Sequence, residues 1–600
     1  MNDDSQRSET RSRVWKYFLW IVVAAFVITV ALMLIDGSIL TPDETTKVEA
    51  PMKKLWWIGV PALAIALLIG VRWITNFVQA RERQAQAQSL AEQSEREMDN
   101  ARTEKGRREY VLEVIGLGVT FEKYRQGKLW DALRAGAAHT TIREQDPRKY
   151  PWAGDEKDGM SGSRSGDTLE NGAWDSVDSW GVPVFNAQPP IHDKNSHDSP
   201  LSPFMGLTAG AESSGMLEHL FVAGPRRFDE RPDRILDDVF KFFDTNPDIP
   251  YVVLNSNDDM TLRDMFAEKK KGAFENDGYY IPAMPDSSTL FLLARRERVD
   301  TVRPFAFEDV EFENNNVEVL NRESIARRLF LTYLDLENTV PMPDDTGRLI
   351  HQRSLTIAEW LPAAAKFGVR PDIRGTGPIS VINRELHMAH RPPLDWKPTP
   401  WFPVPWSKRQ LAEFDNLPTF GFIHRPVFVN MSDEHGKPLA TRALRKQALM
   451  AGWQEALLTL HETERAKGPA RIIAATNNNI EQTLALEGLL TDYAAQGGPE
   501  IDSSKMEHFI NTDKRLGNTG AATLFMQMAI GVMGSYRAGG PSAAINLRDP
   551  REASIVFITP PSDAKRKAQD EARGDVFRPR NSPAINPANY APPVRATGTQ

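Results

Sequence analysis

Residues 110–120 read YVLEVIGLGVT, an apolar run of strand length that begins the folded part of the chain. Similar runs recur further on, and between them apolar residues repeat at helical spacing. Strands are predicted at 110–120, 251–254, 290–294, 379–382, 420–429, 471–475 and 553–559, and helices at 233–243, 322–336, 356–367, 441–460, 480–493 and 521–536. This alternation predicts a large α/β platform, with a mainly parallel sheet covered by helices on both faces.

Composition excludes several classes of protein. The chain has 600 residues, a formal net charge of −8 and no cysteine. The negative charge argues against a nucleic-acid binder, which usually carries a basic field. Without cysteine there is no disulfide, no cysteine-ligated metal and no cysteine nucleophile.

Two long apolar stretches precede the platform. Residues 17–35 are all uncharged, and residues 55–78 are interrupted only by Arg72. Each stretch is long enough for a hydrocarbon core of about 30 Å at about 1.5 Å per residue. Because a second stretch follows, a transmembrane hairpin at 17–78 is favoured over a cleaved signal peptide.

Lysines and arginines predict the orientation of this hairpin. Both outer flanks carry more of them than the connector, which has Lys47, Lys53 and Lys54. The positive-inside rule then places the N-terminal tail, residues 1–16, and the large domain in the cytoplasm.

The rest of the chain divides by composition. Residues 79–109 are rich in Gln, Glu, Arg and Ala and predict a helical stalk. The α/β domain follows at 110–562, and the polar, proline-rich residues 563–600 predict a disordered tail. Within the domain, residues 150–203 are crowded with Gly, Ser, Asp and Pro and predict a long irregular loop insertion. Its tryptophans, Trp152, Trp174 and Trp180, either anchor a partner or pin the loop to the core.

No candidate for catalysis or metal binding survives inspection of its neighbours. The histidine pairs lack the further ligands of a metal site, and GSRSG at 162–166 has arginine where a serine hydrolase has its nucleophile. His461 is interpreted as a cation at the end of a helix. The histidines considered are His192, His197, His387, His390 and His461. We therefore predict no catalytic, metal-binding or cofactor-binding residue.

Three segments resemble the thiolase-like fold of β-ketoacyl synthases. Residues 114–119 (VIGLGV) and 129–136 (LWDALRAG) are similar to its opening strand and helix, and 517–522 (GNTGAA) is similar to the start of a buried helix. The resemblance implies a domain of two halves, 110–385 and 415–562. The synthase cysteine is missing, Asn518 stands in place of a histidine, and Asp513 in place of a lysine, with Lys514 one position too close. This implies a catalytically inactive scaffold; the alternative is that GLG and GNTGAA are ordinary turn glycines.

A further resemblance covers most of the chain. Its motifs are EKYRQG at 122–127, IREQDP at 142–147, YPWAG at 150–154, SRSGDTLENG at 163–172 and DGYY at 277–280. Together they resemble the type VI secretion lipase adaptor family. The resemblance implies a non-enzymatic adaptor in the bacterial inner membrane that binds a phospholipase effector and helps to load it onto the spike protein of the secretion system. It assigns no partner-binding residue. Two alternatives remain, an inner-membrane enzyme acting on acyl or lipid substrates and a structural subunit of a membrane complex.

Overall fold

A computed structural model of the chain describes residues 70, 72, 106, 110–136, 146–147, 154–191, 211, 214–266, 281, 284–310, 321–343, 349–375 and 390–580. The chain forms two compact units, Met1–Glu104 and Lys105–Gln600. The predicted membrane spans lie outside the described residues, apart from Gly70 and Arg72, and so does almost all of the predicted stalk. Within the described ranges, no helix is both long and apolar enough to cross a membrane.

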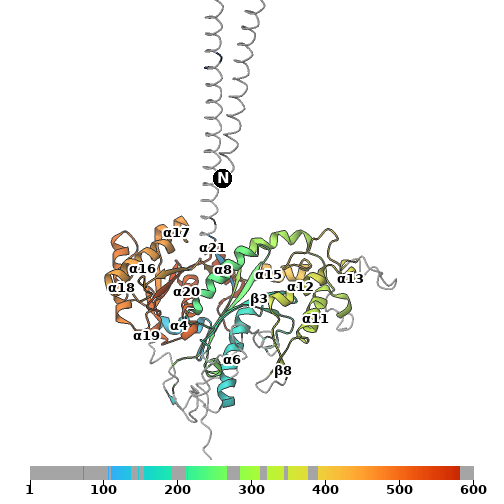
Figure 1. Cartoon of the computed structure of the whole chain (residues 1–600), viewed down its shortest axis with the longest axis horizontal. Helices are drawn as coiled ribbons and strands as arrows, with labels where there is room; N and C mark the ends of the chain where they lie inside the picture. Colours follow the sequence, from blue (N-terminus) through green and yellow to red (C-terminus); the bar gives the residue numbers. More distant parts are fainter. Residues whose placement is uncertain are drawn as a thin grey trace, which may run out of the picture. The chain divides into compact units, whose positions relative to one another are not determined.

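A twelve-stranded sheet forms the centre of the second unit (Figure 1). Its path is β12-β11-β13-β14-β9-β1-β6-β5-β3-β4, with β10 added to β14 and β2 added to β1. The strands are β1 (Leu112–Phe121), β2 (Tyr124–Arg125), β3 (Gly181–Ala187), β4 (Leu220–Arg227), β5 (Tyr251–Asp258), β6 (Ser287–Ala294), β9 (Gly421–Ile423), β10 (Val427–Asn430), β11 (Arg471–Ala475), β12 (Phe509–Asn511), β13 (Ser542–Asn546) and β14 (Glu552–Thr559). A separate hairpin pairs β7 (Pro341–Pro343) with β8 (Leu349–Gln352).

The two halves of this sheet share one topology. From the centre outward the strands are β1-β6-β5-β3-β4 in one half and β9-β14-β13-β11-β12 in the other. In both halves the first two pairings are antiparallel and the last two are parallel. β1 and β9 pair antiparallel and join the halves. The prediction of a mainly parallel sheet is therefore wrong, because parallel pairing is confined to the outer strands.

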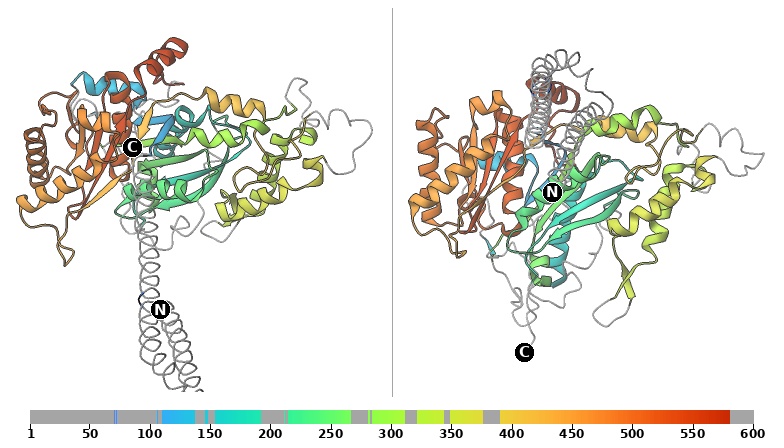
Figure 2. Two further views of the ribbon diagram at one scale, coloured as in Figure 1. Left: turned by 90° about the horizontal axis from the view of Figure 1, so that it is seen from above. Right: turned by 45° about the horizontal axis from the view of Figure 1, so that its top comes forward.

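Helices pack against the sheet (Figure 2). α20 is buried along its length from Thr523 to Tyr536 and packs against strands of both halves. α6 packs on β1 and β6, and α8 packs on β3 and β4. The paired helices α16 and α18 cover the half of the sheet that contains β11, β13 and β14. The helices are α4 (Gly127–Arg134), α6 (Gly154–Ala173), α8 (Ile235–Thr245), α9 (Met260–Phe266), α11 (Ile325–Glu337), α12 (Ile357–Gly368), α13 (Pro371–Arg374), α15 (Lys408–Asn416), α16 (Arg442–Leu457), α17 (Glu462–Lys467), α18 (Ile480–Ala495), α19 (Thr512–Arg515), α20 (Thr523–Ala538) and α21 (Asp563–Arg573).

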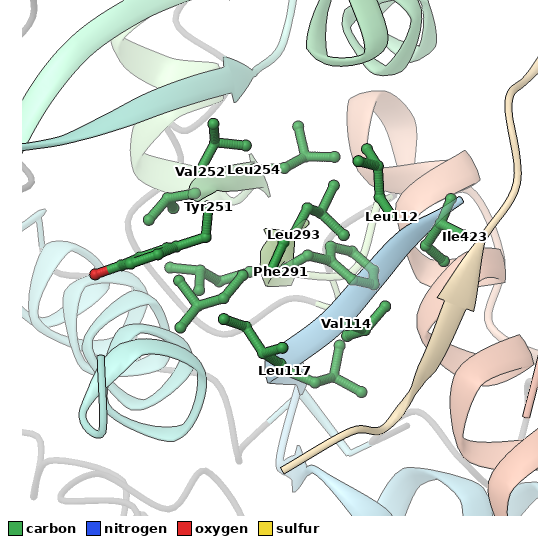
Figure 3. Packing of buried hydrophobic residues seen from close by; sticks show 14 of the residues in the cluster. Leu112, Val114, Leu117, Tyr251, Val252, Leu254, Phe291, Leu293 and Ile423 are labelled. Atoms are coloured by element: carbon green, nitrogen blue, oxygen red, sulfur yellow. The ribbon is translucent and has the colours of Figure 1, made fainter. Parts of the chain in front are cut away.

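One hydrophobic core crosses the junction of the halves (Figure 3). Leu112 and Val114 of β1 lie beside Leu293 of β6 and Ile423 of β9, and all four side chains are fully buried. A second cluster lies beneath α16 and α18 around Trp453, and a third joins α11 and α12 around Trp360. Burial of apolar surface at about 25 cal/mol per Å² makes this shared core the main force holding the halves together.

The predicted loop insertion at 150–203 is wrong where the structure describes it. Its residues form the twenty-residue helix α6 and the fully buried strand β3. Trp180 lies in the core and donates from Nε1 to the carbonyl oxygen of Trp401 at 2.8 Å, so it anchors the fold. Trp174 remains 37% exposed, with the Arg580 guanidinium over its ring. Trp152 lies outside the described residues.

Two other predictions need correction. The predicted disordered tail is wrong for residues 563–580, because α21 begins at Asp563 and Phe577 is buried against Phe420 and Tyr536. The predicted strand at 420–429 is two strands, β9 and β10, and both of them pair with β14. The predicted strand at 379–382 lies outside the described residues.

Candidate functional site

Two of the quoted motifs, EKYRQG and SRSGDTLENG, meet in a buried network of ion pairs. Arg125 Nε lies 2.7 Å from the Asp167 carboxylate on α6, and Arg164 Nη2 lies 3.3 Å from the Glu122 carboxylate. Arg164 also pairs with Asp286 at the start of β6. The side chains of Arg125, Arg164, Glu122 and Asp286 are at most 3% exposed, so removal of one partner leaves a buried charge uncompensated.

The turn after β1 positions two residues of this network, Glu122 and Arg125. Glu122 and Gln126 have φ angles of +49° and +50°, a region that non-glycine residues rarely adopt. The Gln126 side chain holds the turn, since its Oε1 accepts from Val119 N and its Nε2 donates to Leu117 O, both at 2.6 Å. The turn directs Arg125 and Glu122 toward α6.

Glycines let α6 lie unusually close to β1. A Cβ atom at Gly118 would lie 1.9 Å from the carbonyl oxygen of Thr168, and one at Gly116 would lie 2.2 Å from that of Gly172. Both neighbours are backbone atoms, which cannot move aside as a flexible side chain can. The GLG motif therefore serves packing between strand and helix.

A cavity of about 550 Å³ lies beside this network, at the ends of strands from both halves. Ligands in α/β proteins commonly bind outside the carboxyl ends of parallel strands. Four prolines form part of the wall, and the remaining lining residues are mostly charged or amidic. The lining residues are Pro189, Pro190, Asp229, Glu230, Pro232, Asp258, Arg263, Met284, Asn477, Asn518, Gly520, Ala521, Arg548, Asp549, Pro550 and Arg551.

Asp258 connects the network to the cavity. Its Oδ2 accepts from Ala521 N at 2.6 Å, and its Oδ1 lies 3.2 Å from Arg263 Nε. Burial raises the pKa of Asp258 to about 6 despite Arg263. Burial, with Asp286 nearby, raises the pKa of Asp259 to about 7. Gly520 cannot carry a side chain, because its Cβ would lie 1.9 Å from Asp258 Oδ2.

The GNTGAA motif supplies the other side of the cavity. Asn518 is exposed there, and its Oδ1 accepts from Gly520 N at 2.8 Å. Asp513 is buried and accepts from Thr476 N and Asn477 N, at 2.5 and 2.8 Å. Asp513 therefore shapes the turn after β11, while the exposed Lys514 lies in α19.

The remaining candidates do not assemble a site. GSRSG at 162–166 lies inside α6, which is no strand-to-helix turn. His390 contacts the carbonyl oxygen of Glu308, and His192, His197 and His387 lie outside the described residues. The interpretation of His461 is wrong, since it precedes the first residue of α17 rather than ending a helix. In the described part of the chain, no three metal-ligating side chains cluster.

Sequence reasoning did not anticipate Arg263, Asn477 or Arg548 around the cavity. Arg263 lies in α9, and Asn477 and Arg548 lie in the loops after β11 and β13; only the folded topology brings them together. No local motif marks these three residues. By contrast, the two motifs that form the ion-pair network were visible in sequence, although their pairing was not.

Comparison with solved structures returns ketosynthases. The ishigamide ketosynthase/chain length factor has a TM-score of 0.37 and 10% identity, covering 76% of this chain and 100% of that one. The ketosynthase from module 1 of the bacillaene synthase of Bacillus amyloliquefaciens has a TM-score of 0.36 and 8% identity, covering 76% of this chain and 77% of that one. An oxazolomycin ketosynthase domain of Streptomyces albus has a TM-score of 0.35 and 8% identity, covering 80% of this chain and 98% of that one. These are enzymes of the kind that the thiolase-like resemblance names, but scores this low carry no argument about chemistry.

Comparison with protein families identifies both halves of the sheet. Residues 110–277 match the family described as type VI lipase adapter protein Tla3, N-terminal. Residues 420–560 match its C-terminal counterpart. The two matches together span just over half of the chain, and they include both motifs of the ion-pair network and the GNTGAA side of the cavity. The chain therefore belongs to the type VI lipase adapter protein Tla3 family.

Proposed function

We propose that this protein is a non-enzymatic adaptor that binds a toxic phospholipase effector and promotes its loading onto the spike protein of a type VI secretion system. The observation that carries the proposal is the family match in both halves of the sheet. The shared core and the buried ion pairs support it, because an adaptor needs a rigid platform on which a partner surface is preformed.

The composition of the cavity supports a role without catalysis. The chain has no cysteine, and Asn518 stands where the synthase motif has histidine. Among the described residues, two histidine rings contact a threonine hydroxyl. His424 does so with Thr559 in the buried interior, and His461 with Thr463 on the surface. Neither pair lines the cavity, so neither could activate a hydroxyl there.

We also propose that the hairpin at 17–78 holds the adaptor in the bacterial inner membrane, with the N-terminus and the large domain in the cytoplasm. The uncharged run at 17–35, the run at 55–78 and the basic residues on their outer flanks support this arrangement. An anchor of this kind would keep the effector close to the export machine.

Affinity isolation tests the proposal. The full chain is immobilised from a strain that carries the secretion system, and phospholipase activity and spike protein are assayed in the eluate. The proposal expects both to be retained above the level of a mock column. Absence of phospholipase from the eluate would count against it, and so would turnover of ester or thioester probes by the purified chain that Asn518→Ala or Lys514→Ala abolishes.

A further inference from the structure

One wall of the cavity carries three hydrogen-bond donors on loops of the second half. They are the guanidinium of Arg548, after β13, and the side-chain amides of Asn477, after β11, and Asn518, after α19. The chain order separates these loops, but the topology brings them together at one cavity.

Arg548 is a largely buried cation whose ion pair, with Asp513, is long. Its side chain is 17% exposed, and its Nη1 lies 3.8 Å from the Asp513 carboxylate, beyond hydrogen-bond distance. Asp513 is already engaged by two backbone N–H groups. The other contacts of Arg548 are to neutral oxygens, Thr523 Oγ1 at 3.2 Å and Asn477 Oδ1 at 3.4 Å. Burial lowers the pKa of Arg548, in the direction expected for a cation short of compensating charge.

Both amides belong to residues that line the cavity, and the oxygen of each already accepts a hydrogen bond. Asn518 Oδ1 accepts from Gly520 N, and Asn477 Oδ1 accepts from Arg548, which leaves each Nδ2 group as the remaining function. In the part of the chain that the structure describes, neither Nδ2 group donates a hydrogen bond to the protein. A cation flanked by two amide donors is the arrangement that recognises a carboxylate.

The acidic residues around the cavity are mostly neutralised locally. Asp258 pairs with Arg263, Asp229 with Arg227 at 3.4 Å, and Asp549 with Arg551 at 3.3 Å. The exposed Glu230 lies on the loop after β4.

We propose that this cavity receives an acidic side chain of the partner polypeptide, with Arg548 as its anchor and Asn477 and Asn518 as flanking donors. The proposal rests on the adaptor function, because it takes the partner to be the lipase. A cavity of about 550 Å³ accommodates a short extended segment rather than a folded domain, so the lipase would insert a loop or tail.

The test uses the full chain purified in detergent and two fluorescein-labelled peptides, five Glu-Gly repeats and the matched five Gln-Gly repeats. Wild-type protein is expected to bind the glutamate peptide roughly tenfold or more tightly than the glutamine peptide. Arg548→Gln should remove about the same factor. Arg442→Gln makes the same charge change at a residue that is 53% exposed and does not line the cavity, and it should alter binding by less than about twofold.

Asn518→Asp is a second, independent variant of the same site, which keeps the test valid if Arg548→Gln misfolds. It keeps an oxygen for Gly520 N on an exposed residue but replaces the amide donor with a negative charge. It should also weaken the glutamate peptide by about tenfold. Unchanged peptide binding in both Arg548→Gln and Asn518→Asp would overturn the site.

A second arm measures lipase retention by the same variants. Loss of lipase with Arg548→Gln, but not with Arg442→Gln, supports insertion of the lipase into this cavity. If the peptide is lost but the lipase is retained, the docking proposal is wrong and the adaptor function stands. If wild-type protein retains no lipase, the adaptor function fails, while the peptide arm still decides whether the cavity binds carboxylates.

Discussion

Gly118→Ala is expected to destabilise the fold severely, although it only replaces one hydrogen atom with a methyl group. The added Cβ would lie 1.9 Å from the carbonyl oxygen of Thr168 and 2.9 Å from its carbon. Separations this short require α6 to move away from β1 by more than an ångström. Overpacking costs about 1 to 3 kcal/mol, and this shift also strains the 2.7 Å bond between Thr168 Oγ1 and Thr120 Oγ1 and the pair of Arg164 with Glu122. We expect the free energy of unfolding to fall by about 3 kcal/mol.

Urea unfolding of the full chain in detergent, followed by tryptophan fluorescence, measures this loss. Gly162→Ala is the matched control. Gly162 lies in α6, the helix that packs against Gly118, but a Cβ added there would have no atom within 4 Å. Alanine favours helix over glycine by about 1 kcal/mol, so this variant should be stabilised by roughly 0.5 to 1 kcal/mol. Equal midpoints for Gly118→Ala and wild type would refute the close approach of α6 to the sheet.

Three further predictions concern stability. Arg164→Met should cost about 3 to 5 kcal/mol in urea unfolding, because Glu122 loses its buried partner; a cost below about 1 kcal/mol would contradict the network. The pKa of Asp259 is raised from 3.8 to about 7, so the neutral carboxyl group stabilises the fold and the ionised one opposes folding. This stabilisation is fully present below pH 3.8 and is lost as the pH rises to about 7. Asp259→Asn should therefore gain roughly 2 to 3 kcal/mol relative to wild type between pH 5 and 8, and a difference that does not change with pH would contradict this. Phe577→Ala should cost about 3 to 5 kcal/mol, and a thermal midpoint like that of wild type would show that the segment after α21 is not part of the core.

Helical periodicity predicted the longer apolar helices well. The predicted helices near α8, α11, α12, α16, α18 and α20 all occur, and the Asn479 side chain caps α18. α6 was missed for a physical reason. It contains five glycines, and it is held by ion pairs to Glu122 and Asp286 rather than by an apolar stripe.

Sheet topology was beyond local sequence patterns. Strands β1, β5, β6, β11 and β14 were recognisable from their own residues, whereas β3, β4, β12 and β13 were not. The choice between parallel and antiparallel pairing depends on which strands become neighbours. The repeated order of the two halves leaves no repeat in the sequence, because equivalent strands such as β1 and β9 differ in length and composition. The cavity was hidden for the same reason, since Arg548 and Asn477 are 71 positions apart in the chain.

The adaptor function itself is tested most directly by titrating the purified full chain with a purified type VI phospholipase from the same strain, using isothermal calorimetry. We expect saturable binding that persists when the spike protein is added, together with no ester or thioester turnover by the chain alone. Absence of heat at lipase concentrations up to about 100 μM, which corresponds to affinities weaker than about −5.5 kcal/mol, would contradict the adaptor function.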